Sequence, residues 1–95
     1  MKKYKADEEF TARKFVDEVV LVPFGSQMRE NNSMIILNET SAFLWNELKE
    51  EKSIEQLVST LKEEYDAEDA DVYTDVINII DSLQKINAVK TIETE

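Results

Sequence analysis

The hydrophobic pattern changes from strand-like to helix-like spacing across a single polar residue, Asn38. Residues 34–37 are four consecutive apolar residues, two of them adjacent β-branched isoleucines, which predicts a short strand. After Asn38 the apolar positions adopt helical spacing, and a predicted inward face consists of Ala42, Leu44, Trp45 and Leu48. Asn38 itself is predicted to cap this first helix, because its side chain can accept a hydrogen bond from an otherwise unpaired backbone N–H.

Two further strands are predicted before this point. Apolar residues cluster at 15–16 and 19–22 around Asp17 and Glu18, which indicates two strands between Phe10 and Phe24 joined by a tight turn. Pro23 marks the end of the second strand, and residues 25–33 form a polar loop. The prediction is therefore a small three-stranded antiparallel meander. Residues 1–9 show no periodicity and are predicted to be a flexible tail, with the folded domain spanning residues 10–92.

Two more helices follow the first. Ser53 and Gln56 form a capping box, and a clear amphipathic stripe follows it at Ile54, Leu57, Val58, Leu61 and Tyr65. A third helix is predicted over residues 71–86, with Asn87 as its C-cap and a short extended segment at 88–92. Its first apolar row is Val72, Val76, Ile79, Leu83 and Ile86, and a second row is Tyr73, Ile77, Ile80 and Gln84. Two rows indicate either a wide core face or a helix that covers the core on one side and lines a binding site on the other.

Composition and charge exclude several classes of function. The chain has 95 residues, 42% of them hydrophobic, which fits one domain with a modest core. Neither a membrane span nor a signal-peptide core is present in the sequence, so we expect a cytoplasmic protein. A net charge of −10 argues against nucleic acid and anionic membranes as partners. It tolerates a basic or amphipathic peptide, although the charge could equally serve solubility alone.

Catalytic and cofactor-binding motifs are missing from the sequence. The chain has no His and no Cys, and Gly25 is its single glycine, so a general base at neutral pH, a thiol nucleophile and a phosphate-binding loop are all unavailable. The acidic stretch at residues 66–71 lacks the central Gly and distal Glu of a calcium loop, and we expect it at the N-terminal end of the third helix instead. The sequence therefore predicts a binding protein that is not an enzyme and has no cofactor.

The segment Leu37-Asn38-Glu39-Thr40-Ser41-Ala42-Phe43-Leu44-Trp45 resembles the PqqD family, the peptide chaperones of pyrroloquinoline quinone (PQQ) biosynthesis. Residues 53–57 and 75–83 share the resemblance, which covers roughly residues 15–89. Asn87 replaces the glycine that the family often has after its last helix. The resemblance implies an α+β, winged-helix-like domain with a three-stranded antiparallel sheet followed by a three-helix bundle. It also implies that the domain binds the leader of a ribosomally made precursor peptide and presents it to a radical S-adenosylmethionine (SAM) enzyme.

The resemblance further implies that the peptide adds as a strand beside the third strand, in a groove against the third helix. This agrees with the hydrophobic pattern, since an unpaired sheet edge offers main-chain hydrogen bonds to a guest strand. The predicted edge is Met34, Ile35, Ile36 and Leu37, and the predicted facing wall is Tyr73, Ile77, Ile80 and Gln84.

Two alternative functions remain open on the sequence. A winged-helix DNA-binding regulator would need a basic recognition helix, whereas the third helix has Lys85 beside Asp75 and Asp81. A general protein-interaction subunit would use the same sheet edge, with an exposed Phe43 as a contact.

Overall fold

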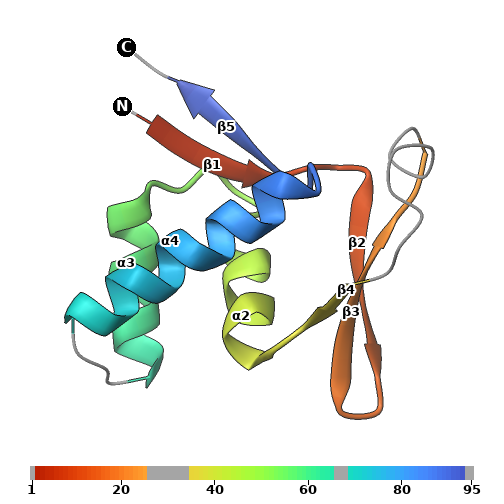
Figure 1. Cartoon of the computed structure of the whole chain (residues 1–95), viewed down its shortest axis with the longest axis horizontal. Helices are drawn as coiled ribbons and strands as arrows, with labels where there is room; N and C mark the ends of the chain where they lie inside the picture. Colours follow the sequence, from red (N-terminus) through yellow and green to blue (C-terminus); the bar gives the residue numbers. More distant parts are fainter. Residues whose placement is uncertain (1, 26–34, 66–68, 94–95) are drawn as a thin grey trace.

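The chain forms a mixed α+β fold in which a three-stranded antiparallel sheet precedes three helices, as predicted (Figure 1). The computed structural model describes residues 2–25, 35–65 and 69–93. The strands are β1 (Lys2–Ala6), β2 (Phe10–Phe15), β3 (Glu18–Pro23), β4 (Ile35–Leu37) and β5 (Val89–Glu93). The helices are α2 (Glu39–Glu47), α3 (Ile54–Tyr65) and α4 (Asp69–Lys85).

The predicted meander is confirmed. Strands β2 and β3 form a hairpin in which Phe15 pairs with Glu18, so that Val16 and Asp17 make the turn. Strand β4 pairs antiparallel with β3, with Val20 opposite Ile36, and the sheet order is β2-β3-β4. Residues 26–33 of the predicted polar loop lie outside the described residues.

The hairpin turn carries backbone strain at Val16, whose φ is 54°. A left-handed conformation is unfavourable for a β-branched residue, and glycine usually occupies this place in a two-residue hairpin turn. The Val16 side chain is 89% exposed and therefore contributes little packing energy. We expect Val16→Gly to raise the free energy of unfolding by about 1 kcal/mol, measured by urea denaturation. Asp17→Gly is the control. Asp17 does not adopt a positive φ, so glycine at this position should not raise the free energy of unfolding.

The predicted helix caps are confirmed. Asn38 caps α2, and its side-chain oxygen accepts a hydrogen bond from the Ser41 N–H at 2.8 Å. Ser53 and Gln56 form the reciprocal capping box at the start of α3: the Gln56 N–H donates to Ser53 Oγ at 3.2 Å, and the Ser53 N–H donates to Gln56 Oε1 at 2.9 Å. After α4, Asn87 adopts a φ of 64°, the left-handed conformation of a C-cap. These caps fix where each helix begins or ends.

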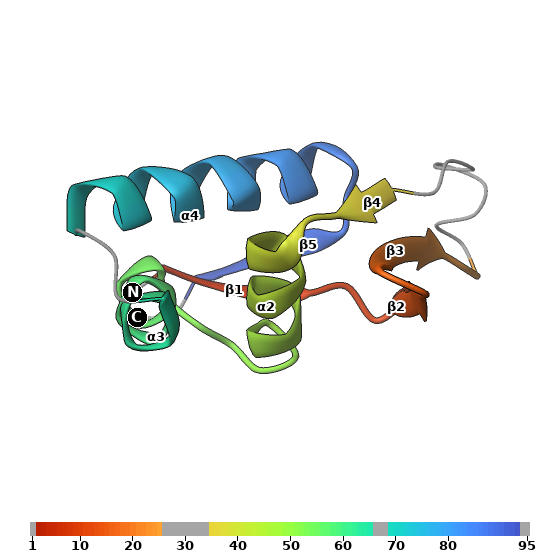
Figure 2. The same cartoon turned by 90° about the horizontal axis from the view of Figure 1, so that it is seen from below.

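The helices form two layers with the core between them. Helix α4 forms one layer, and α2 and α3 form the other layer on the opposite side of the core, as Figure 2 shows. The core is a single cluster, and its fully buried members include Leu21, Leu44, Leu48, Leu57 and Val76. Ile80, from the second apolar row of α4, is also buried, at 3% exposed. For Ile80, the structure therefore supports a wide core face, one of the two alternatives that the sequence left open.

The N-terminal segment differs from the flexible tail that the sequence predicted. Residues 2–6 form β1, which pairs antiparallel with β5, and Tyr4 and Ala6 are buried in the core. The Tyr4 N–H donates to the Lys52 carbonyl at 2.8 Å, and the Lys52 N–H donates to the Tyr4 carbonyl at 2.9 Å. The first residues are ordered because β5 and the segment before α3 both supply main-chain partners. The folded unit thus begins at β1 in the structure, and this second, two-stranded sheet joins the two ends of the described chain (Figure 1).

Two further expectations from the sequence, for the acidic stretch at residues 66–71 and for Phe43, can be compared with the structure. Asp71 lies in the first turn of α4, at the helix end where carboxylates are favoured, whereas residues 66–68 of that acidic stretch lie outside the described part. Phe43 is half-buried rather than exposed, because its ring packs edge-to-face on Tyr65 with centroids 5.9 Å apart.

Candidate functional site

A groove of about 360 Å³ lies between strand β4 and helix α4. Leu37 and Leu83 are buried beneath it, while Ile79 and Ile86 are half-buried and form its apolar wall on α4. The residues that line the groove are Ile35, Ile36, Leu37, Asn38, Ser41, Asn78, Ile79, Ser82, Leu83 and Ile86. The sequence brings these residues together because the Asn38 cap turns the chain directly from β4 into α2, with α4 packed across both.

One side of the groove is the edge of a sheet. Strand β4 pairs with β3 on one side, and no other strand within residues 2–25, 35–65 and 69–93 pairs with it on the other. Its central residue, Ile36, is 63% exposed. An open edge presents main-chain N–H and C=O groups that an extended chain can pair with, and a groove beside the edge can select side chains.

The groove is uncharged, although 34% of the residues in the chain are charged. Its polar lining consists of the amides and hydroxyls of Asn38, Ser41, Asn78 and Ser82. The Asn38 side-chain oxygen accepts a hydrogen bond from the Ser41 N–H, which leaves the Asn38 amide NH2 group and the side chains of Ser41, Asn78 and Ser82 to bond a guest. Such a surface suits an extended peptide that brings apolar side chains and no buried charge.

The structure brings three of the eight predicted site residues together in the groove. Ile35, Ile36 and Leu37 line the groove, and Met34 lies outside the described residues. The predicted wall of Tyr73, Ile77, Ile80 and Gln84 does not line it.

Each residue of that predicted wall lies elsewhere. Tyr73 lines a shallow hollow against α3 with Glu55 and Val58, and Ile80 lies in the core. Gln84 faces β5, where its Nε2 donates to Thr91 Oγ1 at 2.6 Å. Ile77 is 39% exposed and lies on the same flank.

The discrepancy arises because α4 has two flanks beside its buried row, and the sequence does not say which flank faces β4. Ile77 and Ser82 are five residues apart, which places them about 140° apart around the helix axis. The flank that faces β4 carries Asn78, Ser82 and Ile86, spaced at i, i+4 and i+8. The sequence analysis placed Ile79, Leu83 and Ile86 in the first apolar row and passed over Asn78 and Ser82 because they are polar. Short uncharged residues on an otherwise acidic helix were an available signal.

Electrostatic and metal-binding features do not add a reaction centre to the described residues. No group of three or more potential carboxylate ligands that could hold a metal ion occurs in them. Partial burial, followed by the negative charges of Glu39 and Glu64, raises the pKa of the Tyr65 phenol above its ordinary value. No helix in the described part of the chain is long and apolar enough to cross a bilayer.

Two solved structures share this fold. One, described as "TbiB1 in Complex with the TbiA(beta) Leader Peptide", aligns with a TM-score of 0.73 and 21% identity over 90% of this chain and 94% of that one. The other, "Lasso peptide synthetase B1 complexed with the leader peptide", aligns with a TM-score of 0.70 and 21% identity over 95% of this chain and 98% of that one. At this identity the likeness concerns the fold. No curated protein matches the sequence.

The family comparison agrees with the resemblance seen in the sequence. The family model described as "Coenzyme PQQ synthesis protein D (PqqD)" matches residues 18–89, which include β3, β4 and all three helices. The match thus spans the edge strand, the groove and the helix that faces it. On this evidence, the chain belongs to the PqqD family.

Proposed function

We propose that the protein is a non-catalytic recognition domain that binds the leader of a ribosomally made precursor peptide. The observation that carries this proposal is the uncharged groove beside the open edge of β4. In this proposal the leader pairs with Ile35–Leu37 as an additional strand, and its alternate side chains enter the groove. The two solved structures compared above are each described as a complex with a leader peptide, which supports the same role.

The contacts that we propose differ from those expected on the sequence at α4. The main-chain contacts stay on β4, and Met34, which lies outside the described residues, stays a predicted member of the edge. The side-chain contacts on α4 move to Ile79, Ser82 and Ile86, because these line the groove and Tyr73, Ile77, Ile80 and Gln84 do not. The peptide side chains facing them are expected to be aliphatic or aromatic, since a buried charge would have no partner there.

We also propose that the domain works in the cytoplasm and presents the bound leader to a radical SAM maturase. This rests on membership of the PqqD family and on the absence of catalytic side chains from the sequence, which has no His and no Cys. A DNA-binding role finds no support in α4, where Asp71, Asp75 and Asp81 are exposed and Lys85 is engaged with Asp81 at 3.3 Å. A helix of this charge would repel a phosphate backbone.

The proposed function predicts one-to-one binding of a leader peptide in solution. The test is calorimetric titration of the full chain with the leader segment of a short precursor encoded next to its gene. We expect a dissociation constant in the micromolar range or tighter, because strand addition combines main-chain hydrogen bonds with burial of apolar side chains. A scrambled leader of the same composition is the control. Equal affinity for the native and scrambled peptides would contradict sequence-selective recognition.

A further inference from the structure

A second and larger hollow, of about 660 Å³, lies at the opposite edge of the three-stranded sheet. Strand β2 borders it along residues 10–14, and the end of β1 and the helix α2 complete its walls. Its apolar lining consists of Ala6, Phe10, Ala12, Val19, Ala42, Phe43 and Trp45. Trp45 and Phe10, both buried, pack edge-to-face in this lining with centroids 6.4 Å apart. None of the residues that line this hollow lines the groove at β4.

The charge around this hollow is opposite in sign to that of the whole protein. Four cations line it, namely Lys5, Arg13, Lys14 and Lys49, against the three carboxylates of Asp7, Glu8 and Glu39. The local balance, four minus three, is +1, whereas the chain as a whole carries −10. Such a concentration of positive charge on an acidic protein favours a negatively charged partner at this place.

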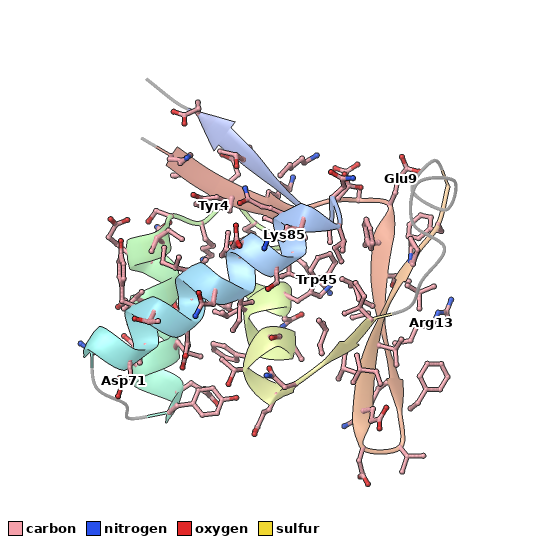
Figure 3. The ribbon with its side chains drawn as sticks, in the orientation of Figure 1. Tyr4, Glu9, Arg13, Trp45, Asp71 and Lys85 are labelled. Carbon is pink, nitrogen blue, oxygen red and sulfur yellow. The ribbon has the colours of Figure 1, made fainter. Side chains whose placement is uncertain are left out.

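These cations are available for a partner. Within the described residues, no ion pair engages Lys5, Arg13, Lys14 or Lys49, whereas Lys52 and Lys85 each contact a carboxylate. Arg13, Lys14 and Lys49 are exposed. In Figure 3, Arg13 projects outward from the hairpin, whereas Trp45, on α2, lies in the interior. Among the carboxylates, Asp7 is half-buried, and its Oδ1 accepts a hydrogen bond from the Glu9 N–H at 2.8 Å.

The backbone at the hollow also has an open edge. Strand β2 pairs with β3, and on its other side the described chain places no strand. Within the described residues, the three-stranded sheet therefore has two open edges, one beside α4 and one beside α2. Figure 2 shows β4 on the α4 side of the hairpin and β2 on the side away from α4.

We propose that this basic hollow docks an acidic segment of a partner protein that carries an aromatic residue, and that it does so while the groove at β4 holds a peptide. The acidic side chains pair with Arg13, Lys14 and Lys49, and the aromatic ring packs on the apolar lining beside Phe43 and Trp45. This proposal does not depend on the identity of the peptide in the groove.

The test is an NMR titration of the isotope-labelled full chain with a synthetic acetylated peptide of glutamates around one central phenylalanine. We expect amide shifts at residues 11–14 and at Asn46 and Lys49, with none at residues 35–37. Arg13→Glu together with Lys14→Glu should weaken binding by about tenfold or more, because two attractions become repulsions. Replacing the phenylalanine of the probe by alanine should weaken binding by about tenfold, since its ring no longer leaves water.

The matched control is Lys2→Glu together with Lys85→Glu, which changes the net charge equally at two exposed residues outside the hollow. It should leave the affinity within about twofold, and so should Ser82→Trp in the β4 groove. An equal loss with this control pair, shifts at residues 35–37, or no binding would overturn the proposal. Sedimentation of the unliganded chain tests one further outcome. If the chain were a dimer that dissociates when Arg13 and Lys14 are both replaced by glutamate, the hollow would be an interface between copies of this chain, and the proposal would be overturned.

Discussion

Replacing Tyr4 by alanine is expected to lower the free energy of unfolding by about 3 kcal/mol. Tyr4 is 9% exposed and belongs to the core cluster, although it lies in the segment that the sequence predicted to be a flexible tail. Its ring fills space between the two-stranded sheet and the helices, so alanine would leave a cavity there. A loss of that size is a large part of the 5–15 kcal/mol that stabilises a typical small domain. Urea denaturation followed by circular dichroism measures the change.

The matched control is Lys2→Ala, on the same strand. Lys2 is exposed and pairs with Glu93 of β5, so the backbone ladder is kept while little packing is lost. We expect a change within about 0.5 kcal/mol. If Tyr4→Ala were as mild as Lys2→Ala, β1 would not be part of the cooperative fold in solution.

Introducing tryptophan at Ser82 is expected to weaken binding of the leader peptide by about a hundredfold or more. Ser82 is exposed on α4 and lines the groove opposite β4, so a large ring there occupies the space that the peptide needs. The corresponding loss of roughly 3 kcal/mol is what removal of a well-buried anchor residue costs an interface. Because Ser82 lies outside the core, thermal stability should change by only a few degrees. Calorimetric titration gives the affinity, and thermal unfolding gives the stability.

Ile77→Trp on the same helix is the decisive control for this prediction. Ile77 is exposed on the flank of α4 that faces away from the groove, about 140° from Ser82 around the helix. We expect the affinity for the leader to stay within about twofold of the unmodified chain. If Ile77→Trp weakened leader binding and Ser82→Trp did not, the peptide would contact the flank of α4 predicted from the sequence, and the binding site proposed here would be wrong.

The features that the sequence predicted correctly depend on local chemistry. Asn38, the Ser53–Gln56 capping box and Asn87 each satisfy backbone groups within a few residues, so their roles can be read without knowledge of the tertiary fold. The hairpin and the third strand likewise follow from clusters of β-branched residues between polar turns. The core face of α4 was visible as a row at helical spacing for the same reason.

The features that the sequence missed depend on partners far along the chain. Strand β1 is short, and its pairing with β5 joins residues at opposite ends of the sequence. The alternation Lys3-Tyr4-Lys5-Ala6 was a period-two signal for it, but two apolar positions are too few to stand out. The residues of α4 that line the groove were missed for a related reason. The rotation of α4 is set by packing of Val76, Ile80 and Leu83 against the other elements, and that rotation turns Ser82 and Ile86 toward β4.

The proposed arrangement gives the domain two separate edges with different chemistry. The groove at β4 is uncharged, so contacts made there should respond weakly to salt, whereas contacts in the basic hollow at β2 should weaken as ionic strength rises. If the domain presents a bound peptide to an enzyme, as we propose, it must hold two partners at once, and the two edges of the three-stranded sheet are the places that we propose for them.

The central claim is that a guest peptide pairs with the open edge of β4, and residue-resolved amide hydrogen exchange tests it most directly. The exchange rates of the full chain are measured by NMR with and without saturating leader peptide. Strand addition predicts slower exchange, by about tenfold or more, for at least one amide among Ile35, Ile36 and Leu37, because outward N–H groups gain a partner. Amides of β2 at residues 11–14 should stay unchanged. Unchanged exchange in β4, with slowing at β2 or along α4 alone, would contradict the account.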